Sequence, residues 1–246
     1  MGRIWAGHRP GRDDPASLCH MLQRMRPASD VQPTVFVVDA DQPMRDSLVM
    51  LVEAMGYSAR GFATAGAFHR FYRREWPGCL VLEVRLPGKN GVDLYEQLVR
   101  EEKRLPVIFI TAHADVTTAV AAMKTGAVEF LEKPFDRKTL LDRIERALAL
   151  DADWRRRQAE FDALDARIAR LNHRDRETLE LILAGESNKV MASRLDISER
   201  AVEMRRAVIM RKLDVSSLAE LLDLAVTHRL LAELAADFPL PRIGSS

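Results

Sequence analysis

The sequence has little cysteine, no long apolar run and almost no net charge. Its 246 residues include two cysteines, Cys19 and Cys79, whose separation fits neither a metal-ligand cluster nor a disulfide framework. We therefore expect a reducing, cytoplasmic environment. No apolar run approaches the roughly 18 residues that a membrane helix needs, so no membrane partner is expected. Residues 1–31 also lack the apolar core of a signal peptide.

The charge balance excludes a globally basic nucleic-acid binder. With 37 basic and 36 acidic residues the formal net charge is +1, so any basic surface must be local. The chain also lacks a glycine-rich phosphate loop and a nucleophile–base pair. We therefore expect no enzyme, no catalytic residue and no cofactor. The overall composition, with 47% hydrophobic and 30% charged residues, is ordinary for a globular protein.

Residues 34–150 alternate between short apolar runs and segments of helical period. The expected strands are 34–38, 57–62, 79–83, 107–111 and 128–131, and the expected helices are 44–55, 66–75, 92–102, 116–125 and 137–150. Fully apolar strands indicate a parallel sheet covered by helices on both faces. Such an α/β sheet carries its functional residues beyond the carboxyl ends of its strands.

Polar residues fall at those ends. Asp39 follows the first strand, Glu83 ends the third, Thr111 ends the fourth, and Lys133 lies just after the fifth. Because parallel strands end at the same edge of a sheet, we expect these four side chains to converge.

A helical linker is expected over residues 151–171, which contain no glycine or proline. Its apolar residues are spaced 7, 3, 4 and 3 apart, which is the pattern of a coiled-coil seam: Trp154, Phe161, Leu164, Ile168 and Leu171. Two interpretations remain open. The linker self-associates, or it lies on its own α/β domain.

The remainder of the chain is predicted to be helical. Helices are expected over 174–184, 188–195 and 199–213, and a last one from a Ser217 cap to about Arg229. The three-residue turn 196–198 between two of them predicts a helix-turn-helix unit. Composition predicts a disordered tail, or a start codon assigned too early, at residues 1–33, and a flexible tail at 233–246.

The helix over 199–213 carries five basic and two acidic residues, which gives five minus two, or +3. An inward stripe is predicted for Ala201, Val202, Val208, Ile209 and Leu213. If this helix enters a DNA groove, its first residues, Arg200, Glu203 and Met204, read bases, with Glu203 accepting from cytosine. The predicted phosphate contacts are Lys189, Arg205, Arg206 and Lys212. The alternative is a solvated basic face.

Four segments resemble the signatures of response-regulator receivers: 37–41 (VVDAD), 79–91 (CLVLEVRLPGKNG), 108–113 (IFITAH) and 127–135 (AVEFLEKPF). Residues 172–229 resemble the LuxR-type helix-turn-helix. The whole is similar to response regulators of the FixJ/NarL type. The resemblance implies a flavodoxin-like, doubly wound five-stranded parallel sheet in a receiver at 34–150, a helical linker at 151–171, and an all-α four-helix DNA-binding domain at 172–232.

The resemblance also implies partners and roles. A sensor kinase or another regulatory protein would contact the receiver, and duplex DNA would bind a homodimer formed through the last helix. Thr111 and Lys133 would bind phosphoryl oxygens, and Thr111 and Phe130 would act as switch residues, although Phe130 also suits a plain core position. Lys133–Pro134 would be a cis peptide.

This chain departs from the receiver pattern at two positions. Glu83 occupies the position of the family's phosphoacceptor aspartate. In the family, an acidic pair after the first strand holds Mg²⁺; here Ala40 occupies the second position of that pair, so that only Asp39 and, one residue further on, Asp41 are acidic. Both changes oppose Mg²⁺ binding and phosphotransfer. Glu83 then either imitates a phosphoaspartate beside Lys133 and Thr111, or forms a plain ion pair with Lys133. In the helix-turn-helix, Ala201 and Arg205 replace a common threonine and histidine.

Two functions follow from these features. The first is a sequence-specific, dimeric transcription regulator that works without aspartyl phosphate. The alternative is a phosphorylation-independent interaction module that sequesters a kinase or another regulator; the basic helix argues against it.

Overall fold

A computed structural model describes residues 32–103, 105–112, 120 and 122–237. In its first half a five-stranded parallel sheet has the order β2-β1-β3-β4-β5. The elements are β1 (Thr34–Val38), α2 (Gln42–Ala54), β2 (Ser58–Phe62), α3 (Ala65–Phe71), β3 (Gly78–Glu83), α4 (Gly91–Arg100), β4 (Val107–Thr111) and β5 (Glu129–Glu132). The doubly wound parallel sheet expected from the sequence is confirmed.

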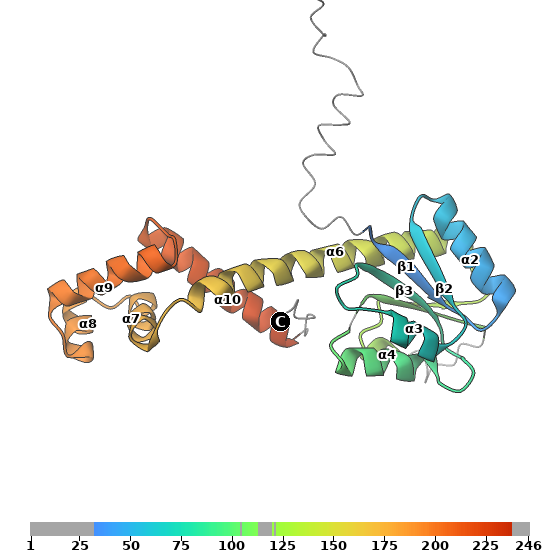
Figure 1. Ribbon diagram of the computed structural model, residues 1–246, viewed down its shortest axis with the longest axis horizontal. Helices are drawn as coiled ribbons and strands as arrows, with labels where there is room; N and C mark the ends of the chain where they lie inside the picture. Colours follow the sequence, from blue (N-terminus) through green and yellow to red (C-terminus); the bar gives the residue numbers. More distant parts are fainter. Residues whose placement is uncertain (1–31, 104, 113–119, 121, 238–246) are drawn as a thin grey trace, which may run out of the picture. The chain divides into compact units, whose positions relative to one another are not determined.

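Helices cover both faces of the sheet because the strand side chains alternate (Figure 1). Phe36 and Val38 join a buried cluster with α3 and α4. Val35 and Val37 point the other way, into a cluster with α2 and the first turns of α6 (Arg137–Ile168). Both faces are therefore packed, and the carboxyl edge of the sheet is left to carry polar groups.

Two helices of the α/β half differ from expectation. The sequence predicts helix throughout 66–75, but α3 ends at Phe71. The Arg155 guanidinium donates to the carbonyls of residues 74 and 76 and so stabilises a turn there. The predicted helix at 116–125 lies largely outside the described residues; residues 120 and 122–124 are helical.

The separate helices predicted at 137–150 and 151–171 are one helix. α6 runs unbroken for 32 residues, because nothing between Leu150 and Asp151 ends it and Asp151 is buried. The seam residues of this helix find partners inside the chain. Phe161 stacks on His228 with ring centroids 5.2 Å apart, and Leu164 and Ile168 pack on the C-terminal core. The later seam residues, Phe161, Leu164 and Ile168, therefore pack on the C-terminal helices.

Four helices follow: α7 (His173–Leu183), α8 (Asn188–Leu195), α9 (Glu199–Lys212) and α10 (Leu218–Asp237). The predicted bounds of α8 match, and those of α7 and α9 agree to a residue. Side chains of Asn172, Ser187 and Ser198 cap α7, α8 and α9. A third buried cluster, which includes Met191, Val202 and Ile209, joins these helices.

The last helix is longer than predicted. α10 continues past Arg229 to Asp237, because residues 230–236 are leucine, alanine and glutamate, all strong helix formers. The start of the tail predicted at 233–246 is thus helical, and residues 238–246 lie outside the described part, as does most of the predicted tail at 1–33.

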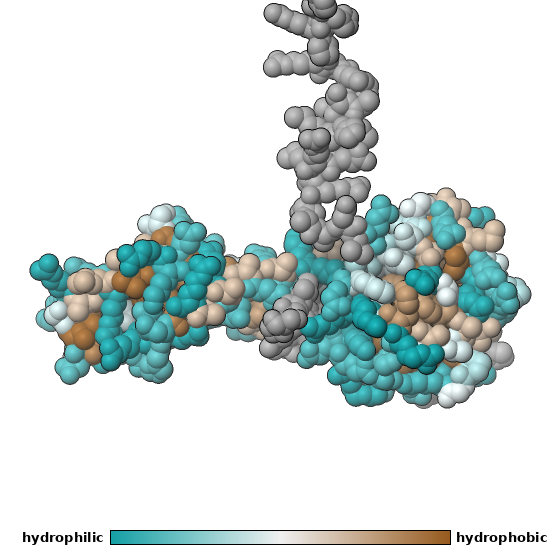
Figure 2. Space-filling view, viewed as in Figure 1, coloured by the Kyte–Doolittle hydropathy of each residue, from teal (hydrophilic) through white to brown (hydrophobic). Residues whose placement is uncertain are grey.

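The surface seen in Figure 2 is mostly hydrophilic, with apolar residues grouped in patches. No helix among the described residues combines the length and apolar character required to cross a bilayer.

Candidate functional site

The carboxyl edge of the sheet brings together charged side chains from the ends of three strands. Asp39 follows β1, Glu83 is the last residue of β3, and Lys133 follows β5. Parallel pairing aligns these ends, with Glu83 opposite Ile110 and Thr111 opposite Glu132. The convergence expected from the sequence is present for all three charged groups, since their side chains are in contact.

Lys133 joins the two carboxylates. Its Nζ donates to Asp39 Oδ2 at 2.8 Å and to Glu83 Oε2 at 2.6 Å. Only 14% of the Lys133 side chain is exposed, against 3% for Asp39 and 10% for Glu83. This is a nearly dry ion triad with one positive and two negative charges.

Backbone amides occupy the other carboxylate oxygens. The Asp41 amide donates to Asp39 Oδ1 at 2.9 Å, and the Arg85 amide donates to Glu83 Oε1 at 3.2 Å. Each of the four carboxylate oxygens therefore accepts a hydrogen bond. These hydrogen bonds offset the cost of burying the two carboxylate charges.

The pKa of Lys133 reflects its position. Burial alone would lower that pKa, but the hydrogen bonds and negative charges of Asp39 and Glu83 outweigh burial, so the pKa of Lys133 is raised above 10.5. The ammonium form is thus held firmly at neutral pH.

Other predicted pocket residues lie around this triad. Thr111 is buried, and its carbonyl accepts from the Lys133 amide at 2.7 Å. The Lys133–Pro134 peptide is cis, as the resemblance implied. Phe130 is half-buried and packs against the first core cluster. Asp41 and Ala40 are exposed.

The second candidate surface is the face of α9 that lies opposite its buried residues. Val202 and Ile209 are buried, which turns Arg200, Glu203 and Met204 to the exposed side. Met204 is 65% exposed. The first two turns of α9 therefore present a cation, an anion and an apolar group outward.

Two of the predicted phosphate contacts have partners inside the chain. Arg206 Nη1 donates to Asn188 Oδ1 at 3.0 Å, which ties α9 to the start of α8. Lys212 Nζ donates to Asp175 Oδ2 at 2.5 Å. Lys189 is exposed and Arg205 is half-buried.

Sequence reasoning missed these cross-helix bonds. The buried Asp175 also completes a capping box with Asn172, so it holds both the start of α7 and the end of α9. The Asn–x–x–Asp spacing was a visible signal for the cap, but nothing in the sequence pointed to Lys212 as its partner.

Two family models match the chain in succession. A "Response regulator receiver domain" matches residues 35–145 and "Bacterial regulatory proteins, luxR family" matches 169–225. The transcriptional regulatory protein FixJ of Bradyrhizobium diazoefficiens is 39% identical over 197 residues, which is 80% of this chain and 96% of that protein. The chain belongs to the DNA-binding response regulators.

Other similar proteins agree with this response-regulator assignment. The response regulator protein TodT of Pseudomonas putida is 37% identical over 206 residues, covering 84% of this chain and 90% of TodT. The solved structure of the response regulator StyR is 43% identical with a TM-score of 0.72, and the match covers 79% of this chain and 98% of StyR. This response regulator therefore combines a two-component receiver with a LuxR-type domain that binds DNA and regulates transcription.

Proposed function

We propose that this response regulator binds specific duplex sites as a homodimer and does so without phosphorylation of its receiver. The observation that carries the proposal is the Lys133 ammonium held between Asp39 and Glu83, at 2.8 and 2.6 Å. The carboxylate at the acceptor position is thus already engaged by the lysine that the family resemblance assigns to a phosphoryl oxygen.

The chemistry of Glu83 supports this view. Its extra methylene carries the carboxylate about 1.3 Å beyond where an aspartate would end, by ordinary bond lengths, away from in-line attack. Both of its oxygens accept hydrogen bonds, from Lys133 and from the Arg85 amide. An anion fixed beside Lys133 resembles a phosphoaspartate in position, although it has one charge and two oxygens where a phosphate has about −1.5 to −2 and three.

Magnesium does not suit this donor set. A Mg²⁺ ion takes near-octahedral oxygen ligands at short range, whereas an ammonium group lies between the two buried carboxylates. Ala40 supplies only a methyl group, and Asp41 is exposed. We therefore assign the receiver no metal and derive no phosphoryl-transfer step through one.

The deciding experiment uses the full chain and a duplex selected by it from a random pool. Wild type and the double variant Ala40→Asp with Glu83→Asp are incubated with acetyl phosphate and Mg²⁺, then assayed for a phosphoryl adduct and for duplex affinity. We expect no adduct and unchanged affinity in wild type, and phosphate-dependent affinity in the double variant. Stoichiometric labelling of Glu83 in wild type would refute the proposal.

A second variant separates the two interpretations of Glu83. If Glu83 imitates the phosphorylated state, Glu83→Gln weakens duplex binding while the protein stays folded. If Glu83 is a plain ion-pair partner, Glu83→Gln lowers stability and leaves the duplex affinity of the folded protein unchanged. The thermal midpoint and the duplex Kd, measured on the same samples, distinguish these outcomes.

For DNA recognition we assign base contacts to the exposed start of α9, Arg200, Glu203 and Met204, and phosphate contacts first to Lys189 and Arg205. Arg206 and Lys212 already donate to Asn188 and Asp175, so they would contact phosphates only through their remaining N–H groups. Failure of the random pool to yield any preferred duplex would favour the alternative, a module that sequesters a kinase or another regulator.

We assign the homodimer contact to α10. Its exposed apolar residues recur every fourth position: Leu218, Leu222, Val226, Leu230 and Leu234. Ridges of this spacing interlock when two helices cross, and a twofold pair would set half-sites about one duplex turn apart. Sedimentation equilibrium tests this: Leu230→Glu should shift the chain toward monomer, whereas the exposed Met55→Glu in the receiver should not.

A further inference from the structure

Arg155 of α6 caps a turn of the receiver. Its Nη2 donates to the carbonyls of Arg74 and Trp76 at 3.2 and 2.6 Å, and its Nη1 to that of Glu75 at 3.1 Å. Its Nε donates to Asp151 Oδ2 at 2.8 Å. One guanidinium thus satisfies three successive carbonyls between α3 and β3.

Asp151 completes this anchor. Its Oδ2 also accepts from the Gly78 amide at 2.9 Å, at the first residue of β3. Only 4% of the Asp151 side chain is exposed, and 17% of Arg155. Burial raises the pKa of Asp151, while Arg155 and the Gly78 amide oppose that rise. A Cβ at Gly78 would lie 2.0 Å from the Thr34 carbonyl oxygen, so the backbone is tightly constrained there.

Arg167, later on the same helix, caps the C-terminus of α9. Its Nε donates to the Leu213 carbonyl at 2.9 Å and its Nη2 to the Asp214 carbonyl at 3.0 Å. Carbonyls at a helix C-terminus have no partner within the helix. A cation there also complements the helix dipole.

A single helix connects the two caps. No glycine or proline interrupts α6 between Arg155 and Arg167. Its side chains are packed near both caps, since Trp154 is buried and Ile168 packs on the C-terminal core. Sharp helix kinks occur almost always at proline, at glycine or serine, or at a π-bulge, and α6 has none of these three residue types between Arg155 and Arg167.

We propose that Arg155 and Arg167 are positioning residues that couple the α3–β3 turn of the receiver to the C-terminus of the DNA-reading helix α9. The inference rests on DNA reading by α9, and it assigns Arg155 a part in DNA binding although Arg155 contacts no residue of α9 in the bonds described above. The coupling is built into the fold and needs no phosphate.

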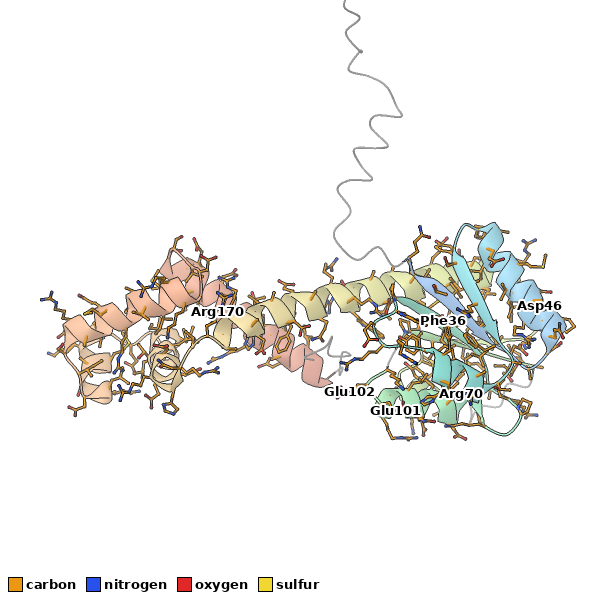
Figure 3. The ribbon with its side chains drawn as sticks, viewed as in Figure 1. Phe36, Asp46, Arg70, Glu101, Glu102 and Arg170 are labelled. Carbon is orange, nitrogen blue, oxygen red and sulfur yellow. The ribbon has the colours of Figure 1, made fainter. Side chains whose placement is uncertain are left out.

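The test uses the full chain with Arg155→Ala, Arg167→Ala and the charge-retaining Arg155→Lys and Arg167→Lys. Matched controls are Arg156→Ala, whose side chain is 75% exposed and pairs with Asp153, and the exposed Arg170→Ala just past α6 (Figure 3). Duplex Kd, its salt slope and hydrogen exchange of residues 199–213 are measured at a temperature where each variant is folded.

We expect both alanine variants to weaken binding of the selected duplex about fivefold or more, the lower end of ordinary site coupling, with an unchanged salt slope. Both should speed exchange at the end of α9, the lysine variants should recover part of the loss, and the controls should match wild type. The inference fails if Arg155→Ala alters exchange only at residues 74–78 and leaves α9 and the Kd as in wild type. If wild type binds no preferred duplex, the exchange result still decides the coupling.

Discussion

The receiver pocket and the start of α9 use charge in opposite ways. In the pocket, Lys133, Asp39 and Glu83 are nearly dry and bonded to one another. On α9, Arg200 and Glu203 are exposed. Buried charges must be satisfied within the fold because burial without a partner is costly, whereas exposed charges remain available to a partner from outside.

The two halves of the chain differ in how their charged side chains are bonded. In the receiver, each carboxylate oxygen of Asp39 and Glu83 accepts a hydrogen bond from Lys133 or from a backbone amide. The DNA-binding half keeps its leading residues free and uses Arg206 and Lys212, at least in part, to join its helices. The structure thus pairs the charged groups within the receiver pocket and leaves those at the start of α9 exposed.

The largest expected effect comes from breaking the buried triad. Lys133→Met should destabilise the receiver by about 3 kcal/mol or more, because it leaves two buried carboxylates unpaired. Urea unfolding followed by circular dichroism measures this. The exposed Lys138→Met should change the unfolding free energy by less than about 0.5 kcal/mol, and an equally small effect at Lys133 would show that the pocket is open to water.

The pH dependence of this contribution follows from the raised pKa of Lys133. A raised lysine pKa adds stability that is fully present below the ordinary value of 10.5 and is lost as the pH rises through the higher folded value. As far as Lys133 titration is concerned, the difference in unfolding free energy between wild type and Lys133→Met should therefore be constant near neutral pH. It should shrink only in strong alkali.

A smaller effect, on binding rather than folding, is expected at the start of α9. Arg200→Ala should weaken the selected duplex by about 1–3 kcal/mol and relax preference at one base pair, with no change in thermal midpoint since the side chain is exposed. Kd values for the selected duplex and its single-base variants test this. The exposed Arg146→Ala in the receiver half is the control.

Lys189→Ala tests whether the DNA-binding half also contacts phosphates. As a phosphate contact it should weaken all duplexes about equally and reduce the salt slope by about 0.9. A loss confined to one sequence would instead make Lys189 a base contact.

The smallest effect is expected at the hydrogen-bond network around Glu101, just after α4. Hydrogen bonds from Lys103, then Gln97 and His69, lower the pKa of Glu101 to about 2. A lowered carboxyl pKa adds stability above the ordinary value of 4.5 that is lost as the pH falls toward 2. Because a third of this side chain is exposed, Glu101→Gln should cost only about 0.5 kcal/mol.

Urea unfolding at neutral pH and near pH 4 checks this. The cost of Glu101→Gln should shrink at the lower pH, and Glu96→Gln, in a longer exposed pair with Arg100, should cost less still. A cost that grows on acidification would contradict the assigned direction of the pKa shift.

Much of the fold could be predicted because its signals are local. Most of the strands were visible as apolar runs, and α8 was bounded correctly with the help of the turn predicted at 196–198. The meeting of Asp39, Glu83 and Lys133 followed from parallel strand topology alone. The same local reasoning ended the helix at Leu150 and ended α10 near Arg229, because periodicity weakens at both points although neither has a helix-breaking residue.

The sequence by itself determined the sheet, the helix-turn-helix and which polar residues share the sheet edge, since periods and caps act over a few neighbouring residues. Only the tertiary structure decided the rest: that Lys212 bonds Asp175, that Arg155 and Arg167 cap carbonyls in two different domains, and that the α6 seam packs within the chain. The bonded pairs are separated by 37 to 81 residues. Their meeting depends on how whole helices pack, which no local pattern specifies.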